Sequence, residues 1–345
     1  MKGRALVVPR SRGELVRRRL REEGLLRPDR TILREGDRLA FPVVEDRLVP
    51  EGLGELSERE FETARPAGPS DYRQQLSRTV PDVGRLPRAF DVVGDIVLIR
   101  IPPELASHAS EVGEALLAFV PGARVVGSDH GVHGTERRRS LERIAGVGDW
   151  RTRHRENGVE IEVDLERAYF SPRLAREHSR VAEEVREGER VYDLCCGVGP
   201  FALTIARGGH AARITAVDSN PEAVSLLRVA QSRRPFGARI TVVEARVEEF
   251  VGAAEPVERV ILNLPHEGIK YLPSVARTVA PRGRLHYYEV TPRTEFERRG
   301  EAVVHALDRP EEWTVKDQHV VHPYSPRSDL VAFVFERSPA EGRDR

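Results

Sequence analysis

The chain has 345 residues, which is too long for one domain of average size, so we expect two or three domains. Its 55 basic and 55 acidic residues cancel to a formal net charge of zero, and 39% of its residues are hydrophobic. These values exclude a histone-like basic protein, an acidic tail and a chain that is disordered throughout. The basic residues are almost all arginine, since Lys2, Lys270 and Lys316 are the only lysines.

The sequence carries no signal for export or membrane insertion. It contains no run of about 18 apolar residues, and its first residues lack the apolar core of a secretory signal. Cys195 and Cys196 are adjacent, which suits neither a disulfide framework nor a zinc site built from several cysteines. We therefore expect a cytoplasmic protein with no metal site.

Residues 1–65 are predicted to form a small module. Residues 1–30 hold ten basic and four acidic side chains, whereas residues 31–62 hold four and nine. A solvated helix face explains such charge blocks as well as a contact with nucleic acid does. The segment Ala64–Ser70 contains two prolines and a glycine, so it is the candidate linker to the rest of the chain.

Residues 72–165 are predicted to form an α+β domain. The segment Phe90–Ile99 is typical of a strand, and residues 104–119 have helical periodicity. Asn157-Gly158 predicts a hairpin with a type I′ turn, because this pair readily adopts two positive φ angles. After the turn, apolar and acidic residues alternate, so one face of that strand is expected to be buried.

From residue 166 to residue 338 the pattern becomes an alternation of strands and helices. Ser171-Pro172 predicts a helix N-cap followed by a proline in the first turn. The expected strands are 190–194, 214–218, 240–244 and 260–264, with helices starting at Pro200, Pro221 and Val247. This alternation predicts an α/β domain with a doubly wound, mostly parallel sheet.

The carboxyl ends of these strands carry polar residues and glycines. Asp193 ends the first strand, and Gly197 and Gly199 leave room for backbone amides to approach a ligand. Pro200 and Phe201 stand where a nicotinamide dinucleotide site usually has its third glycine, which favours S-adenosylmethionine.

The next two strands support a nucleoside ligand. Asp218 is placed to accept hydrogen bonds from both ribose hydroxyls, although it is also placed to cap the helix from Pro221. Glu244 and Ala245 follow where such folds contact the adenine edge. Together these features predict a class I methyltransferase domain.

Taken in order, the motifs of nearly the whole chain resemble those of the archaeal and eukaryotic tRNA guanine-37 N1-methyltransferases. The matching segments are His154–Gly158, Ala168–Leu174, the glycine loop ending in Gly199-Pro200-Phe201, Asp218–Pro221, Asn263-Leu264-Pro265, His286–Glu289 and Tyr324-Ser325-Pro326. The resemblance implies an N-terminal module, a middle domain and a C-terminal methyltransferase. It further implies S-adenosylmethionine as cofactor, tRNA as partner and a monomeric enzyme.

Methylation of guanine N1 needs a base for the N1 proton and a cation near O6. The resemblance places Glu177 as the base, whereas its position alone makes it a first-turn residue that compensates the helix dipole. It places Arg137 at O6. The alternative interpretation of this segment is a strand whose arginines are solvated and contact phosphate. It suits Arg138 better than a role at O6 does, and it suits Arg139 in part.

The remaining site residues also come from the resemblance. Tyr169 is expected to pack on the flipped guanine, Asn263 to bind base or cofactor, and Pro265 to fix the turn. The implied cofactor contacts are His178, Asp193, Gly197, Gly199, Asp218, Ser219, Glu244, Ala245 and Asn263. His178 departs from the family's usual arginine, which predicts a cofactor affinity that is weaker or depends on pH, and Glu244 replaces a commoner aspartate.

Three other functions fit parts of the sequence. The related enzyme that transfers an aminocarboxypropyl group to a modified guanine-37 shares the fold, but a base at Glu177 with Asn263-Leu264-Pro265 favours methyl transfer. Methylation of an exocyclic amine ranks low, since His266 stands where those enzymes have an aromatic residue. A noncatalytic tRNA-binding protein would fail to bind S-adenosylmethionine.

The resemblance also implies that the N-terminal module contacts the outer corner of tRNA.

Overall fold

The computed structural model describes residues 2–50, 52–62, 71–134, 137–208, 213–234, 236 and 239–339. The chain divides into two compact units, Met1–Gln74 and Gln75–Arg345. The candidate linker Ala64–Ser70 lies outside the described residues. No helix in the described part of the chain is long and apolar enough to cross a membrane.

The N-terminal unit is a small sheet with one helix. Its elements are β1 (Lys2–Pro9), α1 (Gly13–Glu22), β2 (Leu33–Glu35), β3 (Arg38–Pro42) and β4 (Glu55–Glu60), with the antiparallel sheet order β2-β3-β1-β4. Alternate residues of β1 are buried on both sides: Leu6 and Val8 pack with Leu20 of α1, and Val7 packs with Phe61. This unit therefore has its own hydrophobic core.

The second unit begins with a four-stranded sheet of order β5-β6-β7-β8. Its elements are β5 (Asp91–Val93), β6 (Ile96–Ile99), α2 (Ala109–Phe119), β7 (Val125–His133) and β8 (Arg138–Gly146). The prediction of one strand over Phe90–Ile99 is wrong. Gly94 has φ +57°, which turns the chain so that β5 and β6 form a hairpin, and a Cβ there would overlap the hydroxyl of Thr152.

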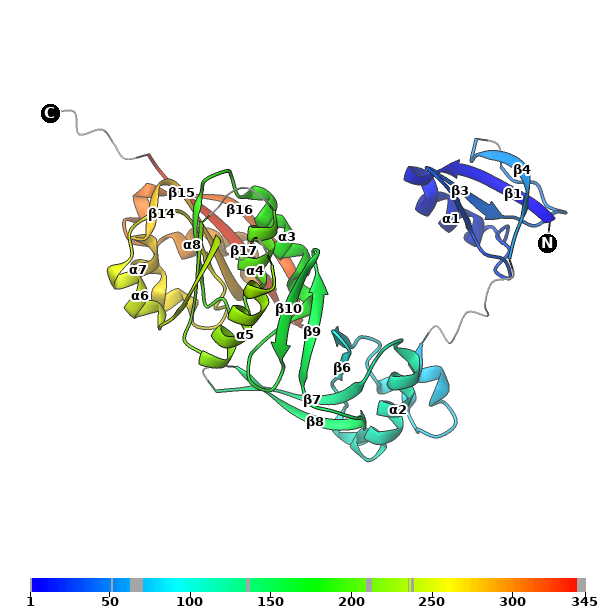
Figure 1. Cartoon of the computed structure of the whole chain (residues 1–345), viewed down its shortest axis with the longest axis horizontal. Coiled ribbons are helices and arrows are strands. Elements are labelled where there is room, and N and C mark those ends of the chain that lie inside the picture. The colour runs from blue at the N-terminus through cyan, green and yellow to red at the C-terminus, as the bar shows by residue number, and fades with distance from the viewer. Residues whose placement is uncertain are drawn as a thin grey trace. The chain divides into compact units, whose positions relative to one another are not determined.

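The hairpin β9 (Arg151–Glu156) and β10 (Val159–Asp164) follows. Asn157 and Gly158 have φ +47° and +73°, which confirms the predicted type I′ turn. The alternating apolar residues of β10 are buried and share one core with apolar residues from β5 and β6 and from α3 to α5 of the following domain. The hairpin thereby joins the β5–β8 sheet and α2, together called the middle region, to that domain (Figure 1).

The C-terminal domain is a seven-stranded sheet of order β13-β12-β11-β14-β15-β17-β16. Its strands are β11 (Arg190–Leu194), β12 (Arg213–Asp218), β13 (Ile240–Glu244), β14 (Val257–Leu262), β15 (Val279–Pro292), β16 (Trp313–Ser325) and β17 (Ser328–Arg337). Its helices are α3 (Ala175–Glu184), α4 (Pro200–Arg207), α5 (Pro221–Ser232), α6 (Val247–Ala253), α7 (Leu272–Ala276) and α8 (Phe296–Val304).

The strands β11 to β15 are parallel, and β17 and β16 extend the sheet in antiparallel pairing. One buried cluster unites the apolar faces of α3, α4 and α5, and a second unites those of α6, α7 and α8. The two groups of helices lie on opposite faces of the sheet (Figure 1). The predicted doubly wound α/β fold is confirmed.

The start of α3 differs from the prediction. Ser171 precedes a 3₁₀ turn at Pro172–Leu174, and its side chain makes no capping hydrogen bond; the α-helix proper begins at Ala175. Ser171 is buried. The predicted position of Ser171 at the N-cap, with Pro172 in the first turn, is confirmed for the 3₁₀ turn that leads the chain into α3, although the Ser171 side chain forms no capping bond.

Candidate active site

A cavity of about 1120 Å³ lies between the middle region and the carboxyl ends of the parallel strands. Open α/β sheets bind ligands at this edge. Nine of the predicted site residues line the cavity: Arg137, Tyr169, His178, Gly197, Asp218, Ser219, Ala245, Asn263 and Pro265. Four others do not line it: Glu177, Asp193, Gly199 and Glu244.

The glycine loop and the end of β12 are joined by hydrogen bonds. Gly197, at φ +54°, donates its backbone N–H to Asp218 Oδ2 over 2.7 Å, and Asn220 N donates to Asp218 Oδ1 over 2.9 Å. The alternative that Asp218 caps the next helix is wrong, since the Asn220 side chain accepts the bond from Glu222 N. Asp218 is thus held at the cavity wall by two backbone donors.

The predicted residues outside the cavity have identifiable structural surroundings. Gly199 has φ +76°, and a Cβ on it would overlap the side chain of Leu227 on α5. Asp193 is fully buried beneath the loop and accepts a bond from Ala202 N over 3.2 Å. Burial, together with the charge of Asp218, raises the pKa of Asp193 to about 7. Glu244 pairs with Asp218 in the sheet register and is exposed.

The middle region contributes Arg137 to the cavity. Its guanidinium lies 4.6 Å from the centroid of the Tyr169 ring, a cation–π contact, and its Nε is buried with no hydrogen-bond partner in the described part of the chain. Burial and the charge of Arg137 lower the pKa of His266, which follows Pro265 directly. Arg137 is therefore a cation with one buried, unpartnered nitrogen among the described residues, near the loop that carries Asn263.

Arg139 is a structural residue. It is 8% exposed, pairs with Asp129 and donates a hydrogen bond to the carbonyl of Phe170 over 3.0 Å. The expectation that Arg139 is partly solvated is wrong: Asp129 and the carbonyl of Phe170 accept from its two terminal nitrogens, while its Nε is buried without a partner among the described residues. Arg138 is exposed, as expected.

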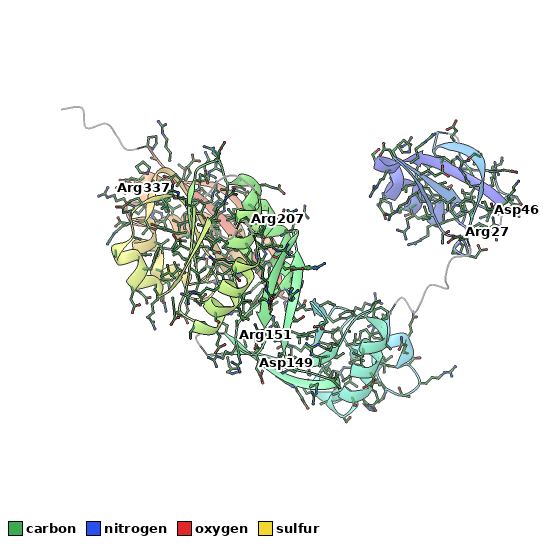
Figure 2. All side chains as sticks on the ribbon, viewed as in Figure 1. Arg27, Asp46, Asp149, Arg151, Arg207 and Arg337 are labelled. Carbon is green, nitrogen blue, oxygen red and sulfur yellow. The ribbon has the colours of Figure 1, made fainter. Side chains whose placement is uncertain are left out.

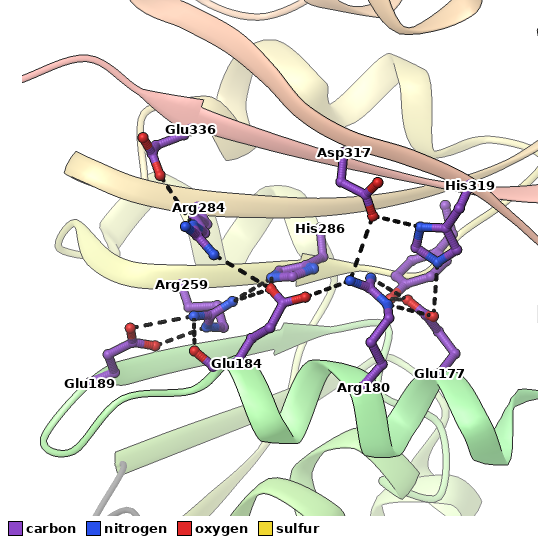
Figure 3. Close-up of polar contacts among 11 residues, drawn as sticks. Glu177, Arg180, Glu184, Glu189, Arg259, Arg284, His286, Asp317, His319 and Glu336 are labelled. Atoms are coloured by element: carbon purple, nitrogen blue, oxygen red, sulfur yellow. Dashed lines mark hydrogen bonds and ion pairs between the residues drawn. The ribbon is translucent and has the colours of Figure 1, made fainter.

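Glu177 is 4% exposed and points from α3 toward β15 and β16 (Figure 3). Arg180 donates to both of its oxygens over 2.7 and 2.9 Å, Tyr288 Oη donates to Oε1 over 2.7 Å, and His319 Nε2 lies 3.0 Å from Oε2. Burial alone raises the pKa of Glu177, but the bonds from His319, Arg180 and Tyr288 outweigh it and hold the pKa well below its usual value.

The partners of Glu177 were not predicted from the sequence. Tyr288 lies in one of the matching segments, so the resemblance could have drawn attention to it. His319 carried no signal, because a histidine in an edge strand is too common a feature to single out. Glu177 does not line the cavity, but its chain neighbour His178 does, and so does His322, three residues after His319 on β16.

His178 belongs to a second buried polar group. Its Nδ1 lies 2.6 Å from Glu156 Oε1, and His154 Nε2 lies 3.6 Å from Glu156 Oε2. Gly94 N donates to His154 Nδ1, which leaves the proton of His154 on Nε2, facing Glu156. Burial raises the pKa of Glu156, but its bonds to His154 and His178 outweigh this and lower it to about 2. His178 Nε2 is buried without a hydrogen-bond partner among the described residues.

The doubly wound sheet, the glycine loop and the acid that ends β12 define a class I methyltransferase domain. The family model described as the TRM5/TYW2 methyltransferase domain matches residues 152–316, the TYW2 N-terminal domain matches residues 72–149, and the tRNA methyltransferase 5 N-terminal domain matches residues 5–49.

Relatives and solved structures match almost the whole chain. It is 34% identical to the tRNA (guanine(37)-N(1))-methyltransferase Trm5b of Pyrococcus abyssi, over 97% of this chain and 99% of the relative. The crystal structure of Trm5b from Pyrococcus abyssi superposes with a TM-score of 0.70 at 31% identity, and the complex of aTrm5 with tRNALeu with 0.70 at 29%. Both cover 97% of this chain and 99% of the other. The chain belongs to the family of tRNA guanine-37 N1-methyltransferases, as its motifs predicted.

Proposed function

We propose that this protein transfers the methyl group of S-adenosylmethionine to N1 of guanine-37 in tRNA. The observation that carries this proposal is one cavity with two kinds of wall. Gly197, Asp218 and Ala245 form a nucleoside-binding edge, while Arg137 and Tyr169 supply a cation and an aromatic face for a base. Membership of the family supports the same reaction.

The residues at the nucleoside edge fit the cofactor. Asp218 accepts from ribose hydroxyls, and Gly197 leaves the space that a Cβ would take near the loop. His178 Nε2, unpartnered in the described structure, is available to the cofactor's polar groups. When bound, S-adenosylmethionine supplies an electrophilic methyl group on a sulfonium.

The opposite wall receives the base. Tyr169 stacks on the flipped guanine, and Asn263 holds its polar edge or the cofactor while Pro265 fixes the loop. Arg137 donates to O6, where negative charge develops as the N1 proton leaves. Its buried Nε without a partner supports this role, because an unsatisfied cation lowers the free energy of such an oxyanion.

Glu177 removes the N1 proton in this proposal. Its lowered pKa keeps the carboxyl ionised throughout the working pH range, so it is ready to accept a proton. The same low pKa makes it a weak base while Arg180, Tyr288 and His319 all bind it. The base therefore gains strength only when one of these partners stops donating.

We assign the contacts with tRNA outside the active site to two surfaces. The first is the N-terminal unit, whose first 30 residues are strongly basic. The second is β9, where Arg151, Arg153 and Arg155 are exposed and alternate along one face. Figure 2 labels Arg151 where the hairpin meets the middle region. The enzyme acts as a monomer in this proposal.

Aminocarboxypropyl transfer to a modified guanine-37 is the second candidate function. The observation in its favour is that residues 72–149 match a domain described from TYW2. A carboxylate at Glu177 favours methyl transfer, because a base at N1 serves that reaction. The mass added to the tRNA separates the two functions.

The test uses tRNA transcripts that carry either G or A at position 37. Purified protein is incubated with S-adenosylmethionine labelled in its methyl group, and incorporation into each transcript is measured. We expect methylation of the G37 transcript alone. Equal labelling of both transcripts would rule out the proposal.

A further inference from the structure

His319 lies between two carboxylates in the network around Glu177 (Figure 3). Its Nε2 is 3.0 Å from Glu177 Oε2, and its Nδ1 is 2.8 Å from Asp317 Oδ2. Asp317 is about half exposed, whereas Glu177 is buried. The imidazole thus connects the proposed catalytic base with a carboxylate in contact with solvent.

The edge strand β16 is shaped for this arrangement. Its pairing with β17 shifts register between Val315 and Asp317 and again between Val320 and His322. Residues 317–320 therefore form a short, regularly paired segment between two irregularities. Within that segment Asp317 and His319 are two residues apart and lie on the same face, toward α3. Bulges of this kind commonly aim side chains next to active sites.

The two distances constrain the proton on the ring. A neutral imidazole has one N–H and can donate to only one of two carboxylates, whereas the imidazolium donates to both. The arrangement Asp317, His319, Glu177 is therefore satisfied when His319 is protonated. In that state Glu177 faces three donors, namely Arg180, Tyr288 and the imidazolium.

The other groups that face His319 and Glu177 do not change their protonation state near neutral pH. Arg180 on α3 contacts Glu177 and lies 3.7 Å from Asp317, and its pKa is raised further despite its burial. From β15, burial raises the pKa of Tyr288 far above its usual value and lowers that of His286 well below, so both stay neutral. Arg180 also donates to Glu184, and Arg259 contacts the Nε2 atom of His286 (Figure 3).

We propose that His319 is a positioning residue that sets the strength of the base. As an imidazolium it holds Glu177 in the network and weakens it. When the imidazolium gives up one proton to solvent and keeps the other on Nδ1, facing Asp317, Nε2 no longer donates to Glu177. Oε2 is then free to take the proton from guanine N1 as the methyl group moves from sulfur to N1. This inference rests on the proposed role of Glu177.

The rate of methyl transfer is expected to fall at low pH. The bond to Glu177 raises the pKa of His319 above its ordinary value, with burial opposing and Asp317 adding to the rise. The active form is the one with neutral His319. Methyl transfer therefore falls as the pH drops below that raised pKa, about tenfold for each pH unit.

The experiment measures the single-turnover rate of methyl transfer to G37 tRNA between pH 5.5 and 9 in the full-length protein. For His319→Gln we expect the fall in rate at low pH, the acidic limb of the pH–rate profile, to disappear, because glutamine contacts Glu177 without titrating. For His319→Arg, which carries a permanent charge, we expect a rate at least about tenfold below the wild-type plateau at every pH. For Asp317→Asn the limb should move to lower pH, because the imidazolium loses an acceptor.

The controls separate this inference from the proposed function. His305→Gln, at an exposed position after α8, should keep the wild-type profile. Glu177→Gln should abolish turnover; if it does not, the proposed base is wrong and the inference falls with it. If Glu177→Gln is inactive but His319→Gln and Asp317→Asn both retain the wild-type limb, only the role of His319 is overturned. Asp317 is half exposed, so its variant keeps the test decisive if His319→Gln does not fold.

Discussion

At the scale of single residues, the site depends on side chains that are buried and yet charged or unsatisfied. Glu156, Glu177 and Asp193 are each less than a tenth exposed, but their surroundings have opposite effects. Histidine, arginine and tyrosine donors lower the pKa values of Glu156 and Glu177, whereas Asp193 has one backbone donor and a raised pKa. Three buried carboxylates on different elements thus have opposite pKa shifts, which suits them to different roles.

The Glu156–His178 pair leads to a prediction about the cofactor. Replacing Glu156 with Gln removes the charge that orients His178, so we expect the affinity for S-adenosylmethionine to fall about tenfold, or ~1.4 kcal/mol. Isothermal calorimetry measures the change. Glu187→Gln, an exposed glutamate after α3, is the matched control and should bind normally. Equal affinities for both variants would show that His178 does not hold the cofactor.

Asp193 leads to a prediction about stability. Its pKa rises from 3.8 unfolded to about 7 folded, so the contribution of Asp193 is fully present below pH 3.8 and is lost as the pH rises to about 7. The loss is on the order of 4 kcal/mol. Asp193→Asn should therefore be more stable than the cofactor-free wild type at pH 8, but not at pH 4.

Urea titrations at the two pH values test this, with the exposed Asp149→Asn as control. A wild-type advantage at pH 8 would mean that Asp193 is ionised and paired in the folded protein.

At the scale of elements, the glycine loop before α4 does two separate jobs. Gly197→Ala places a methyl group 3.5 Å from the nearest atom, the carbonyl oxygen of Tyr169, so it should mainly weaken cofactor binding. Gly199→Ala forces a methyl group into Leu227, so it should lower the melting temperature by several degrees, for a loss of about 1–3 kcal/mol. Both share the cost of a positive φ. Melting curves and calorimetry on the pair check the division, and equal losses of stability would contradict it.

The elements also show which features the sequence can predict. Periodicity and the Asn157-Gly158 pair located the alternating strands and the hairpin, because these patterns act locally. Local patterns failed where a distant contact decided the outcome. Gly94, for example, turns the chain against Thr152. The cap of α5 is a local feature, but it is Asn220 rather than Asp218 that accepts the bond from Glu222 N. The partners His319 and Glu156 were not predicted, since they come from strands more than 20 residues away from Glu177 and His178.

At the scale of the whole molecule, a net charge of zero conceals separate basic surfaces. Removing residues 1–65 should weaken tRNA binding and flatten its dependence on salt, because fewer phosphates are neutralised. Methyl transfer at saturating tRNA should be retained, since every cavity residue belongs to the second unit. Filter binding at several salt concentrations measures the effect. Unchanged affinity would refute a role of the N-terminal unit in tRNA contact.

The most direct test of the central claim is nucleoside mass spectrometry of G37 tRNA after reaction with the protein and S-adenosylmethionine. We expect a single new nucleoside, N1-methylguanosine at position 37, which is absent with Glu177→Gln. An aminocarboxypropyl adduct, a methyl group on the exocyclic amine, or modification at another position would contradict it.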